Sequence, residues 1–258
     1  MRILGKILAV HSFKGGTGKT LISTNLAATC ASQGKNICLL DLDFRAPSLY
    51  VLFKESRSKF WLNDFISGKC EIDDAITDVT KKYGTVGKLF AGLANPSTGA
   101  IQEMLIGSRK GEMTALRRLL SLSKTLLEKR GFDYVILDTS PGLQYSSMNA
   151  VVASDVTLIV SVNDEMDIDG TRRMVRNFYE AFEKKSFILV NKILCDSEYT
   201  PAEKVRLLSR FEKTSEVPLL GIMPLYCDVL RSDRSTIFAL EKPDHPFTKI
   251  IGTFAKHL

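Results

Sequence analysis

Short apolar runs rich in β-branched residues alternate along the chain with longer amphipathic segments. The runs cover residues 6–12, 36–43, 88–93, 133–138, 156–162, 186–192 and 218–224. They are continuous rather than alternating, which is typical of strands buried on both faces of a parallel sheet. Helical spacing marks the segments 20–32, 114–129, 146–153, 170–183 and 201–213. This order predicts an α/β fold with a doubly wound, mostly parallel sheet and helices on both faces.

The length and composition favour one large domain. A chain of 258 residues, 45% of them hydrophobic, can bury a substantial core. Because the sequence shows no internal repeat and no low-complexity linker, we expect residues 1–258 to form a single domain. The segment 96–111, rich in Gly, Ser and polar residues, is expected to be a mobile excursion from it.

The cysteines and the apolar segments indicate the compartment. The five cysteines are scattered without a C-x-x-C pair, so the sequence indicates neither a disulfide framework nor a zinc or iron–sulfur site. No segment approaches the roughly 18 apolar residues of a membrane span, and the first apolar run is too short for a signal peptide. We therefore expect a soluble, cytoplasmic protein.

The stretch SFKGGTGKT, from Ser12 to Thr20, lies between the first predicted strand and the first predicted helix. It matches the phosphate-binding pattern G-x-x-x-x-G-K-[ST] except that Phe13 replaces the first glycine, and it carries a second lysine, Lys14. A strand-to-helix turn that merely needs glycines is the alternative interpretation. The complete order of strand, glycines, Lys-Thr and helix favours phosphate binding.

Each residue type in this loop suits a nucleotide. The glycines let the backbone wrap an anion at the amino end of the helix, where free N–H groups and the helix dipole attract phosphate. Lys19 would reach the β and γ phosphates, and the Thr20 hydroxyl would ligate Mg²⁺. The expected nucleotide contacts are Gly15, Gly16, Thr17, Gly18, Lys19, Thr20 and Leu21.

Carboxylates end two of the other predicted strands. Asp41 and Asp43 close the second strand and Asp138 closes the fourth. Side chains alternate along a strand, so Asp41 and Asp43 point to the same side and can both face the site. A carboxylate after several buried apolar residues is costly unless it meets a cation, here Mg²⁺ or Lys19. The alternatives are a structural cap at Asp138 and a helix-orienting role for Asp43.

The motifs KGGTGKT, DLDFRAPSL, LDTSPG and LVNK resemble those of the deviant Walker A ATPases of the ParA/MinD group, over nearly the whole chain. The resemblance implies a P-loop NTPase fold, with ATP and Mg²⁺ as cofactors and a homodimer when ATP is bound. It also implies roles: Lys14 reaches phosphates held by the other subunit, and Asp43 positions the attacking water. Thr20 would bind Mg²⁺ directly, with Asp41 and Asp138 holding it through water.

Two further sets of nucleotide contacts are expected. Gly142, in the turn after Asp138, would offer its N–H to the γ phosphate and make residues 139–144 a switch. Asn191-Lys192 stands where GTPases carry N-K-x-D, but position 194 is Leu, so adenine is favoured over guanine. By resemblance, Asn191 and the segment from Pro224 to Asp228 hold the adenine. Alternatively, Asn191 only caps a helix.

Several activities occur within such a family. The iron–sulfur scaffolds and tail-anchor targeting ATPases usually carry C-x-x-C, which this chain lacks. The bacterial tyrosine kinases end in a tyrosine cluster, whereas this sequence ends PFTKIIGTFAKHL. A partitioning or positioning ATPase is therefore favoured, with an activating partner protein that triggers hydrolysis. A nucleotide-binding adaptor that does not hydrolyse ATP is an alternative that would not need Asp43.

DNA and a membrane surface are the two candidate matrices. The net charge of +6 is compatible with either. Basic residues cluster at Arg172, Arg173, Arg176, Lys184, Lys185, Arg206, Arg210, Arg231 and Arg234, where they would contact DNA phosphates or form an ordinary solvated face. The tail places Phe247, Ile250, Ile251, Phe254, Ala255 and Leu258 at helical spacing. Such a helix would lie on a membrane or cover the sheet, and we favour a helix that covers the sheet. Of the two surfaces, we therefore favour DNA.

Overall fold

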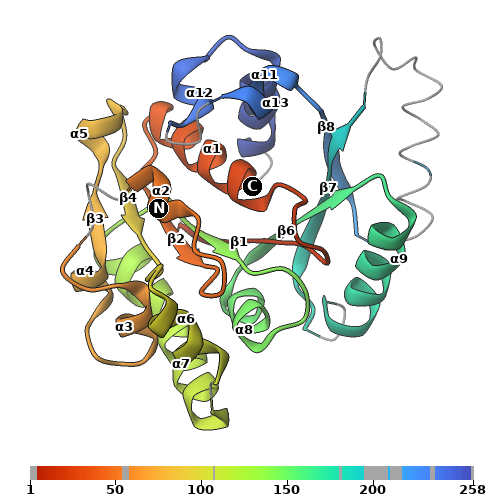
Figure 1. Cartoon of the computed structure of the whole chain (residues 1–258). Coiled ribbons are helices and arrows are strands. Elements are labelled where there is room, and N and C mark those ends of the chain that lie inside the picture. The colour runs from red at the N-terminus through yellow and green to blue at the C-terminus, as the bar shows by residue number, and fades with distance from the viewer. Residues whose placement is uncertain are drawn as a thin grey trace.

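The computed structural model describes residues 5–53, 58–106, 108–179, 182–194, 209, 217–232 and 236–256. An eight-stranded sheet runs through these residues in the order β3-β4-β2-β5-β1-β6-β7-β8 (Figure 1). The strands are β1 (Lys6–His11), β2 (Ile37–Leu42), β3 (Ile76–Asp78), β4 (Leu89–Gly92), β5 (Tyr134–Thr139), β6 (Val156–Val162), β7 (Lys185–Ile193) and β8 (Leu219–Pro224). Every apolar run of the sequence thus forms the predicted strand.

All strand pairs are parallel except β3 with β4, which is antiparallel. β3 was not predicted from the sequence. It is an edge strand of three residues in which Ile76 alone is buried, so it is too short to show a hydrophobic pattern.

Helices cover both faces of the sheet (Figure 1). One face carries α1 (Lys19–Ser32), α12 (Phe238–Glu241) and α13 (Pro246–Ala255). The other carries α7 (Arg109–Leu122) with η2 (Ser123–Lys129), α8 (Tyr145–Ala153), and α9 (Glu165–Met174) with η3 (Val175–Tyr179). A separate hydrophobic cluster lies under each layer. The doubly wound fold is confirmed.

Shorter helices fill the connections: α2 (Leu49–Phe53), α3 (Leu62–Ile66), α4 (Ile72–Ala75), α5 (Thr80–Tyr83), α6 (Thr98–Leu105) and α11 (Cys227–Arg231). The segment that we expected to be an excursion contains α6, whose first turn is capped by the Ser97 hydroxyl. The helix expected at 201–213 lies outside the described residues except for Ser209.

The predicted tail helix forms as α13 and packs against α1 and one face of the sheet. Phe247, Ile251 and Phe254 are at most 4% exposed and belong to the core cluster that contains α1. These three side chains of α13 are therefore occupied by contacts within the protein, as expected for a helix that covers the sheet, and membrane binding by this helix stays a prediction. No helix in the described part of the chain is both long and apolar enough to cross a bilayer.

Candidate functional site

A cavity of about 660 Å³ opens at the edge of the sheet where the parallel strands end. β1 lies between β5 and β6, with β2 and β7 one strand further out, so loops distant in sequence meet here. The lining residues are Gly15, Gly16, Gly18, Lys19, Thr20, Leu21, Thr24, Asn25, Asp43, Arg45, Ala46, Ser48, Val51, Leu52, Ser140, Pro141, Gln144, Lys192, Val229, Leu230 and Thr236. The volume lies within the usual range for a small-molecule site, roughly 300–1,000 Å³.

The loop after β1 has the backbone shape of an anion site. Gly16 and Gly18 have φ of 76° and 101°, in the left-handed region that favours glycine. Gly18 is the residue before the first turn of α1, so the free N–H groups of this helix begin at the loop.

Two side chains at the end of β7 hold this loop from behind. The Asn191 amide donates to the Thr17 carbonyl and the Lys192 ammonium donates to the Gly16 carbonyl, both at 2.7 Å. A Cβ on Gly18 would lie 2.4 Å from Asn191 Nδ2, so glycine is required there for close packing as well. Asn191 does not line the cavity, and its amide group supports the loop. Lys192 does line it, a position that the Asn-Lys dipeptide alone did not reveal.

Lys19 is buried at the base of the cavity, where its Nζ donates to Ser12 Oγ at 2.9 Å. Burial lowers the pKa of Lys19, and the carboxylates of Asp138, Asp43 and Asp167 oppose this effect. A cation held in a cavity of this kind attracts phosphate strongly, because little water screens it.

Asp138 is a buried carboxylate of the site that lacks hydrogen-bond donors among the described residues. It is fully buried, and neither carboxylate oxygen has a hydrogen-bond partner. Burial raises the pKa of Asp138 to about 6, against the opposing influence of the Thr20 hydroxyl and the Lys19 ammonium. An orphaned carboxylate beside a threonine hydroxyl has the hard oxygen donors that Mg²⁺ prefers.

The residues present therefore fit a magnesium ion that is held largely by water and phosphate. In the described part of the chain, no three His, Cys, Asp or Glu side chains converge closely enough to hold a metal by themselves. Mg²⁺ commonly keeps several waters and uses one or two protein ligands with substrate phosphates. Thr20 and Asp138 are the candidates for that role.

Asp41 lies beside Asp138 in the register between β2 and β5 and is equally buried. Its two oxygens accept the N–H groups of Asp43, at 3.1 Å, and Leu49, at 3.3 Å. Burial and the neighbouring Asp138 raise its pKa well above the ordinary range. In this arrangement Asp41 shapes the loop that carries Asp43.

Asp43 faces the cavity from this loop. Its Oδ1 accepts the Ser140 hydroxyl at 2.8 Å and the Ala46 N–H at 3.1 Å. Ser140 belongs to the loop after β5, so one hydrogen bond joins the ends of two strands in front of the phosphate-binding loop. The sequence had indicated Asp43 but not Ser140. Arg45 and Ser48, on the same loop, also line the cavity, and the Ser48 hydroxyl donates to Thr20 Oγ1 at 3.3 Å.

Gly142 is engaged differently from the expectation. Its N–H donates to the Ser12 carbonyl at 2.9 Å, and its carbonyl bonds to Nε2 of the buried His11, also at 2.9 Å. The other ring nitrogen of His11 bonds to the Tyr179 hydroxyl. Gly142 does not line the cavity, so its N–H is available to a phosphate only after the bond to Ser12 breaks.

The two lysines of the loop point to different places. Lys14 does not line the cavity; its Nζ forms an ion pair with Asp164, the residue that caps α9, at 2.7 Å. Phe13 packs against the same helix so closely that a Cβ on Gly170 would overlap its ring. The loop residue that departs from the usual glycine thus anchors the loop to α9.

The segment expected to hold adenine, Pro224 to Asp228, is followed directly by residues that line the cavity. Neither Pro224 nor Asp228 lines the cavity, whereas Val229 and Leu230 of α11 do. Asp228 instead pairs with His245 at 2.9 Å. α11, which begins within the predicted segment, thus offers apolar surface to the cavity, and the adenine contacts stay a prediction.

The basic and acidic clusters near α9 neutralise each other in part. Arg172 and Arg173 both pair with Asp169. Buried Asp167 accepts the Ser161 hydroxyl and the Val162 N–H. Other members of the predicted basic set, Arg206, Arg210 and Arg234, lie outside the described residues. The described part of this surface is a mixed-charge face.

Comparisons with known proteins agree with this geometry. A family model described as an AAA domain matches residues 5–192. The septum site-determining protein MinD of Synechocystis is 27% identical over 86% of this chain and 76% of its own length. The antiactivator FleN of Pseudomonas aeruginosa is 25% identical over 92% and 77%. The structure of MinD complexed with Mg-ADP from Pyrococcus horikoshii superposes with a TM-score of 0.74 at 20% identity, covering 98% of this chain and 96% of that one.

Proposed function

We propose that this chain, which belongs to the ParA/MinD family of P-loop ATPases, is a switch that dimerises on binding Mg-ATP and is reset by hydrolysis. The placement of the two loop lysines carries the proposal. Lys19 lies in the cavity of its own chain, whereas Lys14 lies outside it. A cation that stands beside a phosphate site without entering it is available to a second copy of the chain.

Two facing sets of phosphates repel each other unless cations lie between them. A long, flexible lysine from each subunit provides this charge. Dimer formation would then require ATP in both cavities and the release of Lys14 from Asp164. The dimer would therefore form only when both subunits hold ATP.

Hydrolysis would depend mainly on positioning and charge. The N–H groups of the loop and Lys19 would bind the β and γ phosphates. Asp43, fixed by Ser140, would orient the attacking water. Thr20 and Asp138 would hold Mg²⁺, which supplies positive charge to the phosphates.

Adenine would be the base. Leu194 stands where guanine-binding proteins place an aspartate, and Val229 and Leu230 offer apolar surface. ATP should therefore bind far better than GTP in a competition titration. Equal affinities for the two nucleotides would remove this part of the proposal.

The cellular role proposed is intracellular positioning, with cytoplasmic localisation and an activating partner protein. Relatives named for septum-site determination and for antiactivation both align along most of the chain. The pairing of Arg172 and Arg173 with Asp169 weakens the case for a DNA surface on α9, and burial of the α13 face weakens the case for a membrane helix. Sedimentation with DNA or with anionic vesicles, each with and without ATP, distinguishes the two.

The central test measures molar mass by light scattering after the protein is mixed with Mg-ATP, Mg-ADP or no nucleotide. The proposal expects a dimer with ATP only, together with slow phosphate release. A monomer under all three conditions contradicts the switch. A dimer that releases no phosphate favours the non-hydrolysing adaptor.

A further inference from the structure

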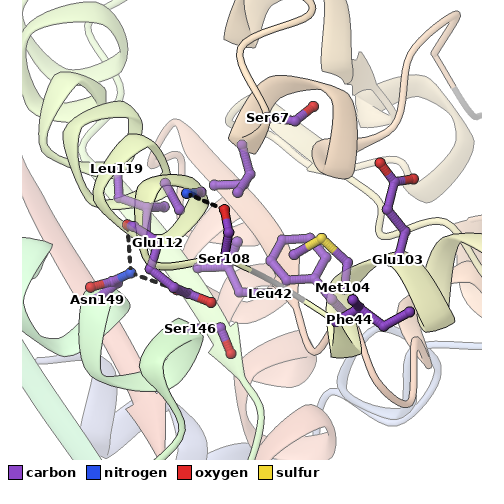
Figure 2. Close-up of a pocket in the computed structure, with 14 residues that line it drawn as sticks. Leu42, Phe44, Ser67, Glu103, Met104, Ser108, Glu112, Leu119, Ser146 and Asn149 are labelled. Atoms are coloured by element: carbon purple, nitrogen blue, oxygen red, sulfur yellow. Dashed lines mark hydrogen bonds between the residues drawn. The ribbon is translucent and has the colours of Figure 1, made fainter.

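A second cavity, of about 290 Å³, lies between α3, α6, α7 and α8 (Figure 2). Leu42 and Phe44 line it, whereas Asp43, the residue between them, lines the nucleotide cavity. The segment 42–44 is therefore a wall that two cavities share. A molecule in the second cavity would contact the neighbours of the carboxylate to which we assign the attacking water.

The interior of this second cavity is apolar. Phe44 and Leu119 are at most 3% exposed, and Met104 lies beside Phe44 in Figure 2. Its volume is close to the lower limit of roughly 300 Å³ for small-molecule sites. Space of this size and lining suits a single aryl or alkyl group rather than a nucleotide or sugar.

The charge of the cavity is negative. Glu103 and Glu112 line it, and Figure 2 shows Glu112 with Asn149 and Ser146 on one side and Glu103 on the other. The described residues of the lining include no Lys, Arg or His. This contrasts with the chain as a whole, which has a net charge of +6.

Within the described residues, the Glu112 carboxylate forms no ion pair. The one hydrogen bond that it accepts from them comes from Asn149 Nδ2, at 3.2 Å. Burial raises the pKa of Glu112, and the positive charge of Arg45, with which it forms no ion pair, opposes this effect. Glu103 differs, because it pairs with the exposed Lys69 at 3.8 Å. Glu112 is thus the half-buried carboxylate that a cation entering the cavity would meet.

We propose that the second cavity binds a small organic cation whose apolar group lies against Phe44, Met104 and Leu119 and whose ammonium or guanidinium group pairs with Glu112. Occupation of the cavity changes the rate of ATP hydrolysis through the shared segment 42–44. The first statement stands on the cavity alone, and the second rests on the function proposed above for Asp43.

The test of binding uses phenylbutylamine as the cationic probe and phenylbutanol as its neutral counterpart, by calorimetry on nucleotide-free protein. The amine should bind at least about tenfold more tightly than the alcohol, because a charge-assisted contact is lost with the alcohol. Glu112→Gln should remove that difference. Glu128→Gln removes the same charge at an exposed position and should leave the difference in affinity between the amine and the alcohol unchanged.

The location is read from the methyl resonances of methionine. The amine should move the signal of Met104, which lines the cavity, and leave that of Met166, which is 71% exposed on α9. No binding of the amine, equal binding of amine and alcohol, or a shift at Met166 alone would overturn the site.

Coupling is measured separately, as phosphate release with and without saturating amine, in the unsubstituted protein and in Glu112→Gln. We expect a change of rate in the first and none in the second. An unchanged rate with the amine bound overturns the coupling between the cavities. A protein without ATPase activity that still binds the amine overturns the proposed function and leaves the site standing.

Discussion

Lys14 Nζ lies 2.7 Å from Asp164 Oδ1, so the phosphate-binding loop after β1 is joined by an ion pair to the first residue of the α9 region. The same carboxylate oxygen accepts the Asp167 N–H at 2.9 Å and thereby caps the helix. The neighbouring Lys14 ammonium lowers the pKa of Asp164, as does this helix cap. Lys14 is therefore held away from its own nucleotide cavity until a stronger anion attracts it.

Removing this ion pair should favour the dimer. Asp164→Asn keeps a good helix cap but loses the charge, so α9 should remain intact while Lys14 is released. We expect dimerisation at a few-fold lower ATP concentration, measured by light scattering across an ATP titration. Asp169→Asn, which removes a nearby charge that does not contact Lys14, is the matched control. A higher ATP requirement in Asp164→Asn would mean that Asp164 assists the dimer instead.

The two lysines of the loop should separate binding from assembly. Lys14→Ala should bind ATP nearly normally, because the loop amides, Lys19 and Thr20 remain, but should not dimerise or hydrolyse. Lys19→Ala should lose ATP binding, since phosphate charge in the cavity is then uncompensated. Binding is measured by calorimetry and mass by light scattering. Normal dimerisation of Lys14→Ala would rule out a contact between subunits.

Hydrolysis should depend on Asp43. Asp43→Ala should still bind ATP and accumulate as an ATP-bound dimer, with phosphate release lowered at least about 100-fold, since general-base or water-orienting groups typically contribute that much. Ser140→Ala should have a smaller effect, because it loosens Asp43 without removing it. Unchanged turnover in Asp43→Ala would exclude the role assigned to it.

The buried Asp138 carboxylate should lower the free energy of unfolding when neither Mg²⁺ nor nucleotide is bound. Its pKa is raised to about 6 from 3.8, so the folded chain holds a proton that the unfolded chain has lost between these values, and the full cost is present above pH 6. Asp138→Asn should therefore raise the free energy of unfolding at pH 7.5 by about 3 kcal/mol without Mg²⁺ or nucleotide. Urea unfolding checks this. The variant should gain less from added Mg-ATP than the unsubstituted protein does.

His11 should make stability fall in mild acid. Burial lowers its pKa from 6.5 to about 4, with the Gly142 carbonyl acting in the opposite direction. Between these values the unfolded chain binds a proton that the folded chain does not, so the stabilisation is complete above pH 6.5 and is lost as the pH falls. The difference in unfolding free energy between the unsubstituted protein and His11→Gln should shrink by about 2 kcal/mol from pH 7.5 to pH 5. The effects of Asp41 and Asp138 act in both proteins and cancel. If the difference in unfolding free energy between the two proteins did not change with pH, the protonation of His11 would not be the cause of the acid effect.

The sequence predicted the parts of the site that are local in the chain. The loop glycines, Lys19 and Thr20 follow one another, and Asp43 and Asp138 end recognisable apolar runs. A strand end is a position that hydrophobic patterning defines, and parallel strands gather their ends at one edge. The fold and the cavity's main residues could therefore be predicted from the sequence alone.

Contacts between distant segments were not accessible in the same way. The Lys14–Asp164 pair and the bond of His11 to Tyr179 join residues more than a hundred positions apart, and no pattern in the sequence connects them. That Val229 and Leu230 line the cavity whereas Asp228 does not depends on where one short helix begins. A boundary of this kind is decided by packing, which a single sequence does not record.

The contact of Asn191 with the phosphate-binding loop has a consequence for the order of folding. Asn191 and Thr17 are 174 positions apart, and Lys192 and Gly16 are 176 apart, so the loop is not held in place until β7 joins the sheet. Contacts of such long range close a large segment of chain and form late. During synthesis from the amino end, a chain that ends before β7 would carry the whole glycine motif without its support. The ability to hold nucleotide is thus acquired only after about three quarters of the protein has been made.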